Sequence, residues 1–238
     1  MKGRRLLNAV RNSRFHYFVC SLIEKLESEG FTLSYSQAGE DLLIKNIFGK
    51  NKREGFYVDI GCNNPIQKSN TFKLYLKGWS GICADGNASL IKRFRKIRKR
   101  DICLQEIVSE NITELTFYQD DVHHELSSVD PAVGMELRSA GNDLKEIKVR
   151  STTLNDILEK HRPSGKIDLL CIDVENHDLE VLKGNNFEKF RPEIICAEFY
   201  GDIESLRGGE LNSFLLSKGY ELLIFSTASV LYRRKSAS

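Results

Sequence analysis

The stretch FYVDIGCNNP, residues 56–65, is a short apolar run that ends in an acid and is followed by one glycine. Comparable apolar runs recur along the chain, at residues 81–84, 102–104, 107–108, 167–172 and 193–197. Helix-like patterns lie between these runs, at residues 37–48, 71–77, 88–99, 154–161 and 179–190. Near-continuous apolar strands that alternate with helices predict an α/β fold, a doubly wound parallel sheet covered on both faces.

The C-terminal part departs from this alternation. After a helix predicted at residues 210–216, the stretch GYELLIFSTASVLYRR (219–234) indicates two strands around a tight turn. We therefore expect an antiparallel hairpin that closes the parallel sheet. The stretch 114–154 predicts a strand, a long loop and a second strand, and so long a loop in a compact domain is usually functional or disordered.

Composition restricts the classes of function. Among 238 residues, 35 Lys and Arg face 33 Asp and Glu, so no overall field favours nucleic acid or a membrane surface. No stretch approaches the roughly 20 apolar residues of a membrane span. Residues 1–34 predict a basic amphipathic helical extension, with a weak peripheral membrane contact as an open alternative, and residues 35–238 predict one catalytic domain.

The cysteines indicate a reducing compartment. The chain has 6 Cys, without a CxxC pair and without the spacing of a metal site. Most of them lie in or next to apolar runs, where free cysteine behaves as a small buried hydrophobe. We therefore expect a cytoplasmic protein and no structural metal.

Four of the predicted strand exits carry an acid. Open parallel sheets bind ligands at the carboxyl ends of their strands, so these exits are expected to form one site. The exits are Asp59-Ile60-Gly61-Cys62-Asn63, Asp85-Gly86-Asn87, Asp173-Val174-Glu175-Asn176-His177 and Glu198-Phe199-Tyr200.

The first two exits favour an adenosine ligand without phosphates. The first has one glycine and no complete GxGxxG, and an acid at Asp59 disfavours a pyrophosphate. Asp85 lies 26 residues further on (85 − 59), where an acid usually binds ribose hydroxyls. S-adenosylmethionine is the ligand that best fits this pattern.

Four stretches, FYVDIGCNNP (56–65), GWSGICADGNAS (78–89), STTLNDIL (151–158) and IDLLCIDVENHDLEVLKG (167–184), resemble the FkbM-type family of class I S-adenosylmethionine-dependent O-methyltransferases. YSQAGEDLLI (35–44) resembles a lead-in found in one branch of that family. The resemblance implies a Rossmann-like, seven-stranded, mostly parallel sheet with the cofactor over the first two strand exits. The chain departs from the family pattern at Asn64-Pro65, where a second glycine is common, at Cys171, where Lys is frequent, and at Asn176, where Gly is usual.

The resemblance and the strand exits together name the candidate site. The cofactor-binding candidates come from the first two exits, the following loop and the lead-in: Asp59, Gly61, Cys62, Asn63, Ser69, Asn70, Asp85, Gly86, Asn87, Gln37 and Glu40. Helix capping is the alternative role for Ser69 and Asn70, and for Gln37 and Glu40.

Asp173, Glu175 and His177 are the catalytic candidates, because they follow the strand predicted at residues 167–172, where methyl donor and acceptor should meet. His177 alone has an ordinary pKa near neutrality, and a carboxylate would need burial to become a comparable base. Alternatively, the two acids cap the helix that follows from Asp178. Nothing in their spacing demands a metal.

These inferences predict an O-methyltransferase that acts on a hydroxyl of a saccharide or glycosylated small molecule. An RNA methyltransferase is a second possibility, because Lys92–Arg100 has seven basic residues in nine. We interpret that run as the solvated face of a helix, since Ile91, Phe94 and Ile97 form an apolar stripe along it. A non-catalytic binding protein on the same fold is a third possibility.

Overall fold

A computed structural model describes residues 29–49, 51–120, 127–162 and 164–236. Tyr35–Ser238 forms one compact unit, and Met1–Ser34 forms a separate one. The helix predicted in residues 1–34 lies largely outside the described residues. Within the described ranges, no helix combines the length and the hydropathy that crossing a membrane requires.

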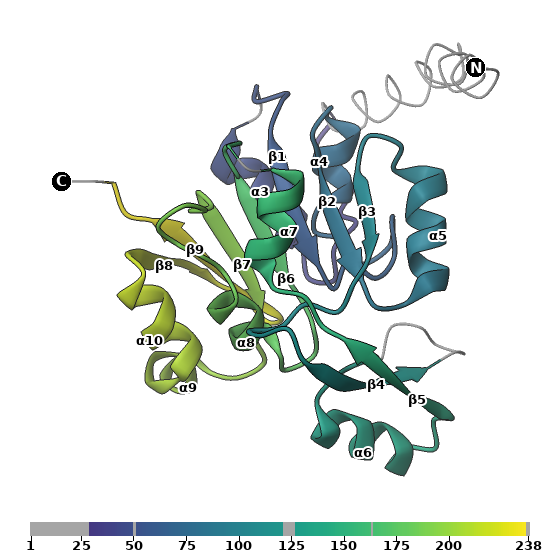
Figure 1. Cartoon of the computed structure of the whole chain (residues 1–238). Helices are drawn as coiled ribbons and strands as arrows, with labels where there is room; N and C mark the ends of the chain where they lie inside the picture. The colour runs from purple at the N-terminus through teal and green to yellow at the C-terminus, as the bar shows by residue number, and fades with distance from the viewer. Residues whose placement is uncertain (1–28, 50, 121–126, 163, 237–238) are drawn as a thin grey trace. The chain divides into compact units, whose positions relative to one another are not determined.

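A seven-stranded sheet with the order β3-β2-β1-β6-β7-β9-β8 forms the centre of the unit (Figure 1). The five parallel strands are β1 (Phe56–Ile60), β2 (Ser80–Asp85), β3 (Ile102–Gln105), β6 (Leu169–Ile172) and β7 (Ile194–Glu198). Both C-terminal strands, β8 (Tyr220–Phe225) and β9 (Ser229–Arg234), pair antiparallel. The predicted fold class and the closing hairpin are confirmed.

Side chains from alternate strand positions enter two separate cores. Val58 and Ile60 of β1 join one core, and Tyr57 between them joins the other. The first core is covered by α7 (Leu154–His161), α8 (Asp178–Lys183), α9 (Ile203–Gly208) and α10 (Glu210–Ser217). The second core is covered by α3 (Glu40–Phe48), α4 (Phe72–Leu76) and α5 (Ala88–Ile97). Strands buried on both faces explain the continuous apolar runs of the sequence.

Two predicted elements are shorter than expected. Residues 107–108 form no strand, and Val108 makes only an isolated bridge to Thr152. The helix predicted at 179–190 ends at Lys183. Gly184 follows at a close approach, where an added Cβ would lie 2.4 Å from the carbonyl oxygen of Ser109. The remaining apolar residues of that stretch, Phe187 and Phe190, are buried without a helix.

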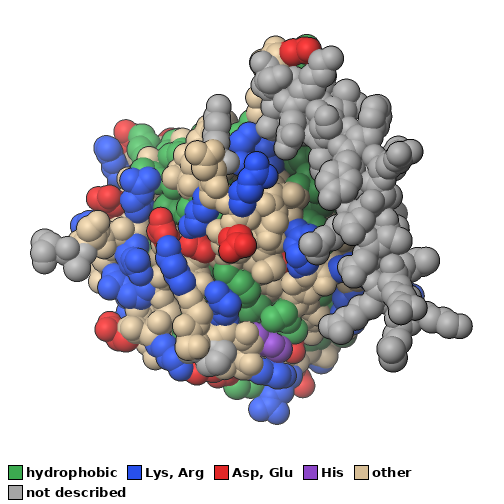
Figure 2. Space-filling view, turned by 90° about the horizontal axis from the view of Figure 1, so that it is seen from above, with side chains coloured by type: hydrophobic (Ala, Val, Ile, Leu, Met, Phe, Trp, Pro, Cys, Tyr) green, Lys and Arg blue, Asp and Glu red, His purple; other side chains and the backbone are tan. Residues whose placement is uncertain are grey.

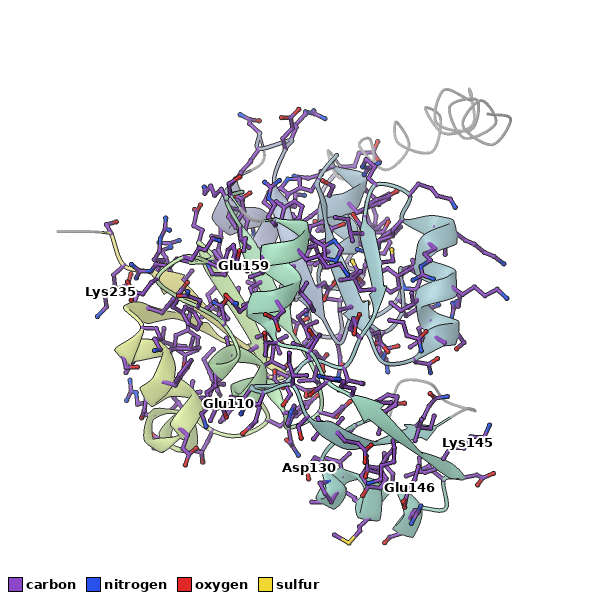
Figure 3. All side chains as sticks on the ribbon, viewed as in Figure 1. Glu110, Asp130, Lys145, Glu146, Glu159 and Lys235 are labelled. Atoms are coloured by element: carbon purple, nitrogen blue, oxygen red, sulfur yellow. The ribbon has the colours of Figure 1, made fainter. Side chains whose placement is uncertain are left out.

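The stretch predicted as strand, loop and strand forms a small module beside the main sheet. β4 (Glu114–Asp120) and β5 (Leu144–Arg150) pair antiparallel, and the loop contains a helix that we did not predict, α6 (Pro131–Ser139). Asp130 accepts a hydrogen bond from the Ala132 amide, so an Asp-Pro start signal was present in the sequence. Arg138 of α6 donates to Glu146 of β5 at 2.7 Å. Figure 3 labels Asp130 and Glu146 on this module.

The basic run 92–100 is only partly the solvated face that we predicted. Lys92, Arg93 and Lys96 are exposed, but the side chain of Arg98 is 0% exposed. Arg98 directly follows α5, and its guanidinium lies near the rings of Phe72, Tyr75 and Phe94 in the second core. The prediction is therefore wrong for this residue.

The five cysteines in the described ranges are free and buried, as the sequence predicted: Cys62, Cys83, Cys103, Cys171 and Cys196. A cytoplasmic location stays a prediction.

Candidate functional site

A cavity of about 280 Å³ lies at the carboxyl ends of β1, β2, β6 and β7. All three catalytic candidates, Asp173, Glu175 and His177, line it. Nine of the cofactor candidates do so as well: Gln37, Asp59, Gly61, Cys62, Asn63, Ser69, Asn70, Asp85 and Gly86. The strand exits thus open onto one cavity, and its role as the ligand site stays a prediction.

Two predicted cofactor residues lie behind the cavity wall. Asn87 is 1% exposed, and its side-chain oxygen accepts from the Ser89 amide at 2.9 Å, which caps α5. Glu40 is also 1% exposed, and its carboxylate accepts from the Ala38 amide at 2.9 Å. Neither side chain is among the residues that line the cavity. For Glu40, a local role was the alternative that sequence reasoning left open, whereas the capping contact of Asn87 was not predicted.

The first loop turns without a glycine-rich motif. Gly61 has φ +76°, and an added Cβ would lie 1.8 Å from the carbonyl oxygen of Asp173, so only glycine fits there. Asn63 also takes a positive φ, of 45°, which asparagine tolerates. The side-chain oxygen of Asn64 then accepts from the amides of Ile66 and Gln67 at 3.0 and 3.1 Å. Side-chain hydrogen bonds therefore define this loop where the family commonly has a second glycine.

Asp85 is fixed at the end of β2 by two backbone amides. Asn63 donates to one carboxylate oxygen at 3.0 Å, and Asn87 donates to the other at 2.7 Å. Burial raises the pKa of Asp85 to about 6 although both hydrogen bonds favour the charged form. The carboxylate is thus mainly ionised at neutral pH, and its remaining lone pairs can accept from hydroxyl groups in the cavity.

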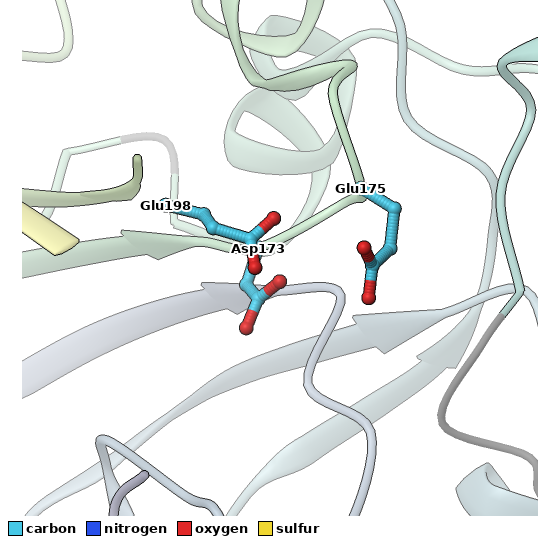
Figure 4. A group of neighbouring side chains, drawn as sticks. All are labelled: Asp173, Glu175 and Glu198. Atoms are coloured by element: carbon cyan, nitrogen blue, oxygen red, sulfur yellow. The ribbon is translucent and has the colours of Figure 1, made fainter. Parts of the chain in front are cut away.

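Three carboxylates gather where β6 and β7 end. Oxygens of Asp173, Glu175 and Glu198 all lie within 4.8 Å of one another (Figure 4). Glu198 was noted at a strand exit but was not among the predicted site residues. Elsewhere the surface is different, since Lys and Arg gather on the face seen in Figure 2, from above the view of Figure 1.

The protein surroundings of this cluster favour protonation. Asp173 opens onto the cavity, yet surrounding protein atoms desolvate it, and this burial together with the charge of Glu198 raises its pKa well above the usual range. Burial and the charge of Glu175 raise the pKa of Glu198 to about 7. A carboxylate with a raised pKa holds a proton more strongly than an ordinary carboxylate, which makes it a stronger base when it is ionised.

Asp173 and Glu175 do not cap the following helix. The residue before α8 is His177, whose side chain makes no capping hydrogen bond. Glu175 and Asn176 have φ values of +54° and +68°, in the left-handed region. Asparagine tolerates this conformation better than most residues, which explains how Asn176 can stand where the family usually has glycine.

His177 is held by a serine that sequence reasoning missed. Its Nε2 lies 2.9 Å from the Oγ of Ser109, and its Nδ1 lies 3.8 Å from a carboxylate oxygen of Glu180. Burial lowers the pKa of His177, although the charges of Glu180 and Asp130 act in the opposite direction. The imidazole is therefore neutral at neutral pH, with one nitrogen engaged by Ser109. No motif pointed to Ser109, because its contact joins segments 68 residues apart.

A seven-stranded α/β sheet with this strand order, and an acidic cavity at its strand exits, is the arrangement expected of a class I S-adenosylmethionine-dependent methyltransferase. The family model described as the methyltransferase FkbM domain matches residues 59–222, and the chain belongs to this family. The cofactor of this methyltransferase is S-adenosylmethionine. A comparison with curated proteins finds no match.

Several solved structures are similar at low identity. The TehB-like SAM-dependent methyltransferase from Corynebacterium glutamicum is 13% identical, with a TM-score of 0.42, and the alignment covers 94% of this chain and 100% of that one. The METTL16 MTase domain is 15% identical, with a TM-score of 0.44 and coverages of 81% and 64%. Precorrin 8w decarboxylase from Methanobacterium thermoautotrophicum is 13% identical, with a TM-score of 0.41 and coverages of 82% and 89%. These likenesses are too low to inform the chemistry.

The residues of the cavity fit the cofactor. Asp85 offers lone pairs for ribose hydroxyls, and Ile107, Val108 and Phe117 provide an apolar wall for an adenine ring. Gly86 leaves room for two side chains of this wall, because an added Cβ would lie 2.2 Å from Ile107 and 2.9 Å from Phe117. The side-chain oxygen of Asn63 is buried without a protein hydrogen-bond partner and can accept from a ligand amine.

Proposed function

We propose that this methyltransferase acts on a hydroxyl group of a saccharide or a glycosylated small molecule. The observation that carries the proposal is the pair Asp173 and Glu198, two carboxylates of raised pKa that line the same cavity as the cofactor candidates. A hydroxyl needs a base within hydrogen-bond reach, and a base whose pKa lies near the working pH is the most effective.

The charges of the cavity also favour a neutral, hydroxyl-rich acceptor. Six acids line it, namely Asp59, Asp85, Glu106, Asp173, Glu175 and Glu198, and Lys68 is the cation among the lining residues. Carboxylates accept hydrogen bonds from sugar hydroxyls, but they repel phosphate and carboxylate groups. For the same reason an RNA backbone is a poor acceptor here.

S-adenosylmethionine supplies an electrophilic methyl group on a sulfonium centre. The chain contributes three things to the transfer. Asp85 and the first loop orient the nucleoside, and the acids balance the positive charge of the cofactor. Asp173 or Glu198 would accept the proton of the acceptor hydroxyl as the new C–O bond forms and the bond between the methyl carbon and the sulfonium sulfur breaks, which leaves S-adenosylhomocysteine as a neutral thioether. Orientation of this kind is the main source of rate enhancement when little covalent chemistry is required of the protein.

The test is methyl transfer from isotopically labelled S-adenosylmethionine to a panel of acceptors. The panel contains neutral glycosides, the matching sugar phosphates and uronic acids, and a short RNA. We expect turnover on neutral glycosides, and a fall in kcat of about 100-fold or more in Asp173→Asn and Glu198→Gln. Glu204→Gln, on the exposed surface of α9, is the matched control and should retain wild-type activity.

Preferred turnover on the RNA or on the anionic sugars would refute this acceptor class. Cofactor binding without turnover on any acceptor would instead favour a non-catalytic binding protein. That alternative was motivated by the departures at Asn64-Pro65 and Asn176, and the backbone accommodates both positions, so no observation now favours it.

A further inference from the structure

Arg98 is a buried cation that the chemistry described above does not use. It follows the last turn of α5, and its side chain is 0% exposed. Removal of a guanidinium from water is strongly unfavourable unless its donors and its charge are satisfied. The partners of Arg98 should therefore reveal why a cation is tolerated inside the core.

Three donors of the guanidinium point to one segment, the loop that follows β1. Nε donates to the carbonyl oxygen of Pro65 at 2.9 Å. Nη1 donates to Oγ1 of Thr71 at 2.7 Å, and Nη2 donates to Oγ of Ser69 at 2.5 Å. One side chain thus connects both ends of residues 65–71.

That loop forms part of the cofactor cavity. Lys68, Ser69 and Asn70 line the cavity. Thr71 connects Arg98 to Asp59, because its hydroxyl accepts from Arg98 and donates to a carboxylate oxygen of Asp59 at 2.5 Å. Asp59 lines the cavity as well. Of the three residues that Arg98 contacts in the loop, Ser69 lines the cavity and Thr71 is next in sequence to a lining residue, Asn70. Pro65 does not line the cavity.

We propose that Arg98 is a positioning residue for S-adenosylmethionine, holding residues 65–71 in the shape that presents Ser69 and Asn70 to the cofactor. The inference rests on the cofactor and not on the identity of the acceptor. A glycine-poor loop has few ways to fix its shape from its own backbone, and the fork of an arginine can bind several acceptors at fixed angles.

A purely structural role is the competing explanation. The guanidinium carbon lies 5.0–5.7 Å from the ring centroids of Phe72, Tyr75 and Phe94, and Nη1 lies 3.7 Å from a carboxylate oxygen of Asp101. These contacts would stabilise the core whether or not the cavity binds a ligand. The two roles differ in what a conservative substitution changes.

Arg98→Lys keeps the charge but cannot reach all three acceptors. We expect the Kd for S-adenosylhomocysteine, measured by isothermal titration, to rise at least about tenfold, since charged hydrogen bonds to the loop are lost. Hydrogen exchange should become faster in peptides that cover residues 62–72 and stay unchanged in β6 and β7.

Two neighbouring arginines are matched controls. Arg95 donates to the carbonyl oxygen of Cys103 at 3.1 Å, and Arg100 donates to that of Trp79 at 3.4 Å, so both bind backbone outside the loop. Arg95→Lys and Arg100→Lys should leave the Kd within about threefold of the wild type, whatever they do to the melting temperature.

A folded Arg98→Lys variant with a lower melting temperature and a Kd within threefold of the wild type would overturn the proposal. If that variant does not fold, Thr71→Val tests the same connection with Arg98 intact, and an unchanged Kd would again overturn it. Absence of binding to the wild type would overturn both the cofactor assignment and this inference, whereas unaffected binding in the variants would overturn this inference alone.

Discussion

Asp178 should make the protein less stable as the pH rises. Its side chain is buried beneath the carboxylate cluster, where it accepts from the amides of Glu198 at 3.2 Å and Val174 at 3.4 Å. Burial raises its pKa from 3.8 to about 7. A raised pKa in the folded state means that the stabilising contribution of this group is complete below pH 4 and is lost as the pH rises towards 7.

The magnitude follows from the same values. Between pH 5 and pH 8, the folded protein must release the proton of Asp178, while the unfolded chain has already released it. The difference corresponds to about 3 kcal/mol. Asp178→Asn removes this titration and keeps one oxygen for the Glu198 amide. The free energy of unfolding of the variant minus that of the wild type should therefore increase by about 3 kcal/mol as the pH is raised from 5 to 8.

Urea denaturation at pH 5, 6, 7 and 8 measures this difference directly. Asp202→Asn is the control, because Asp202 lies on the exposed surface and hydrogen bonds from Ser205 lower its pKa. That variant should keep the wild-type slope above pH 5. If Asp178→Asn and the wild type give parallel curves from pH 5 to pH 8, Asp178 is not protonated in the folded protein and the reasoning fails.

Three further outcomes are expected. Asp85→Asn should weaken binding of S-adenosylhomocysteine by about tenfold or more in isothermal titration, and an unchanged Kd would exclude Asp85 as a ribose ligand. Gly61→Ala should lower the free energy of unfolding by more than about 3 kcal/mol, because the added Cβ would lie 1.8 Å from a backbone oxygen. Gly141 has φ +88° and no atom within 4 Å of an added Cβ, so Gly141→Ala should lower the free energy of unfolding by about 1–2 kcal/mol through backbone strain alone. Glu198→Gln removes a charge that raises the pKa of Asp173, so the acidic limb of any residual pH–rate profile should move to lower pH, and a shift to higher pH would contradict the coupling.

The sequence predicted the sheet and the position of the site because both follow from local patterns. Apolar runs identify buried strands, and an acid directly after such a run must lie at the carboxyl edge of the sheet. Asp59, Asp85 and Asp173 were found in this way, and all three line the cavity. Glu198 occupies the same kind of position, but it lies outside the stretches that carried the family resemblance and was not included among the candidates.

Contacts between distant segments escaped prediction. Ser109 reaches His177, and Arg98 reaches Ser69, across loops whose conformations no local pattern specifies. The sequence around Arg98 was also misleading, because a run of basic residues is typical of a solvated helix. Only the end of α5, where the backbone leaves the helical conformation, turns this one side chain inward.

The first loop shows why the residue types of a motif are a poorer guide to a site than the position of the motif in the fold. A second glycine would permit a tight turn through its backbone freedom, and this chain has Asn64 and Pro65 instead. Asn64 supplies an acceptor for two amides, and Arg98 supplies a donor for the carbonyl of Pro65, so side chains do what backbone freedom does elsewhere.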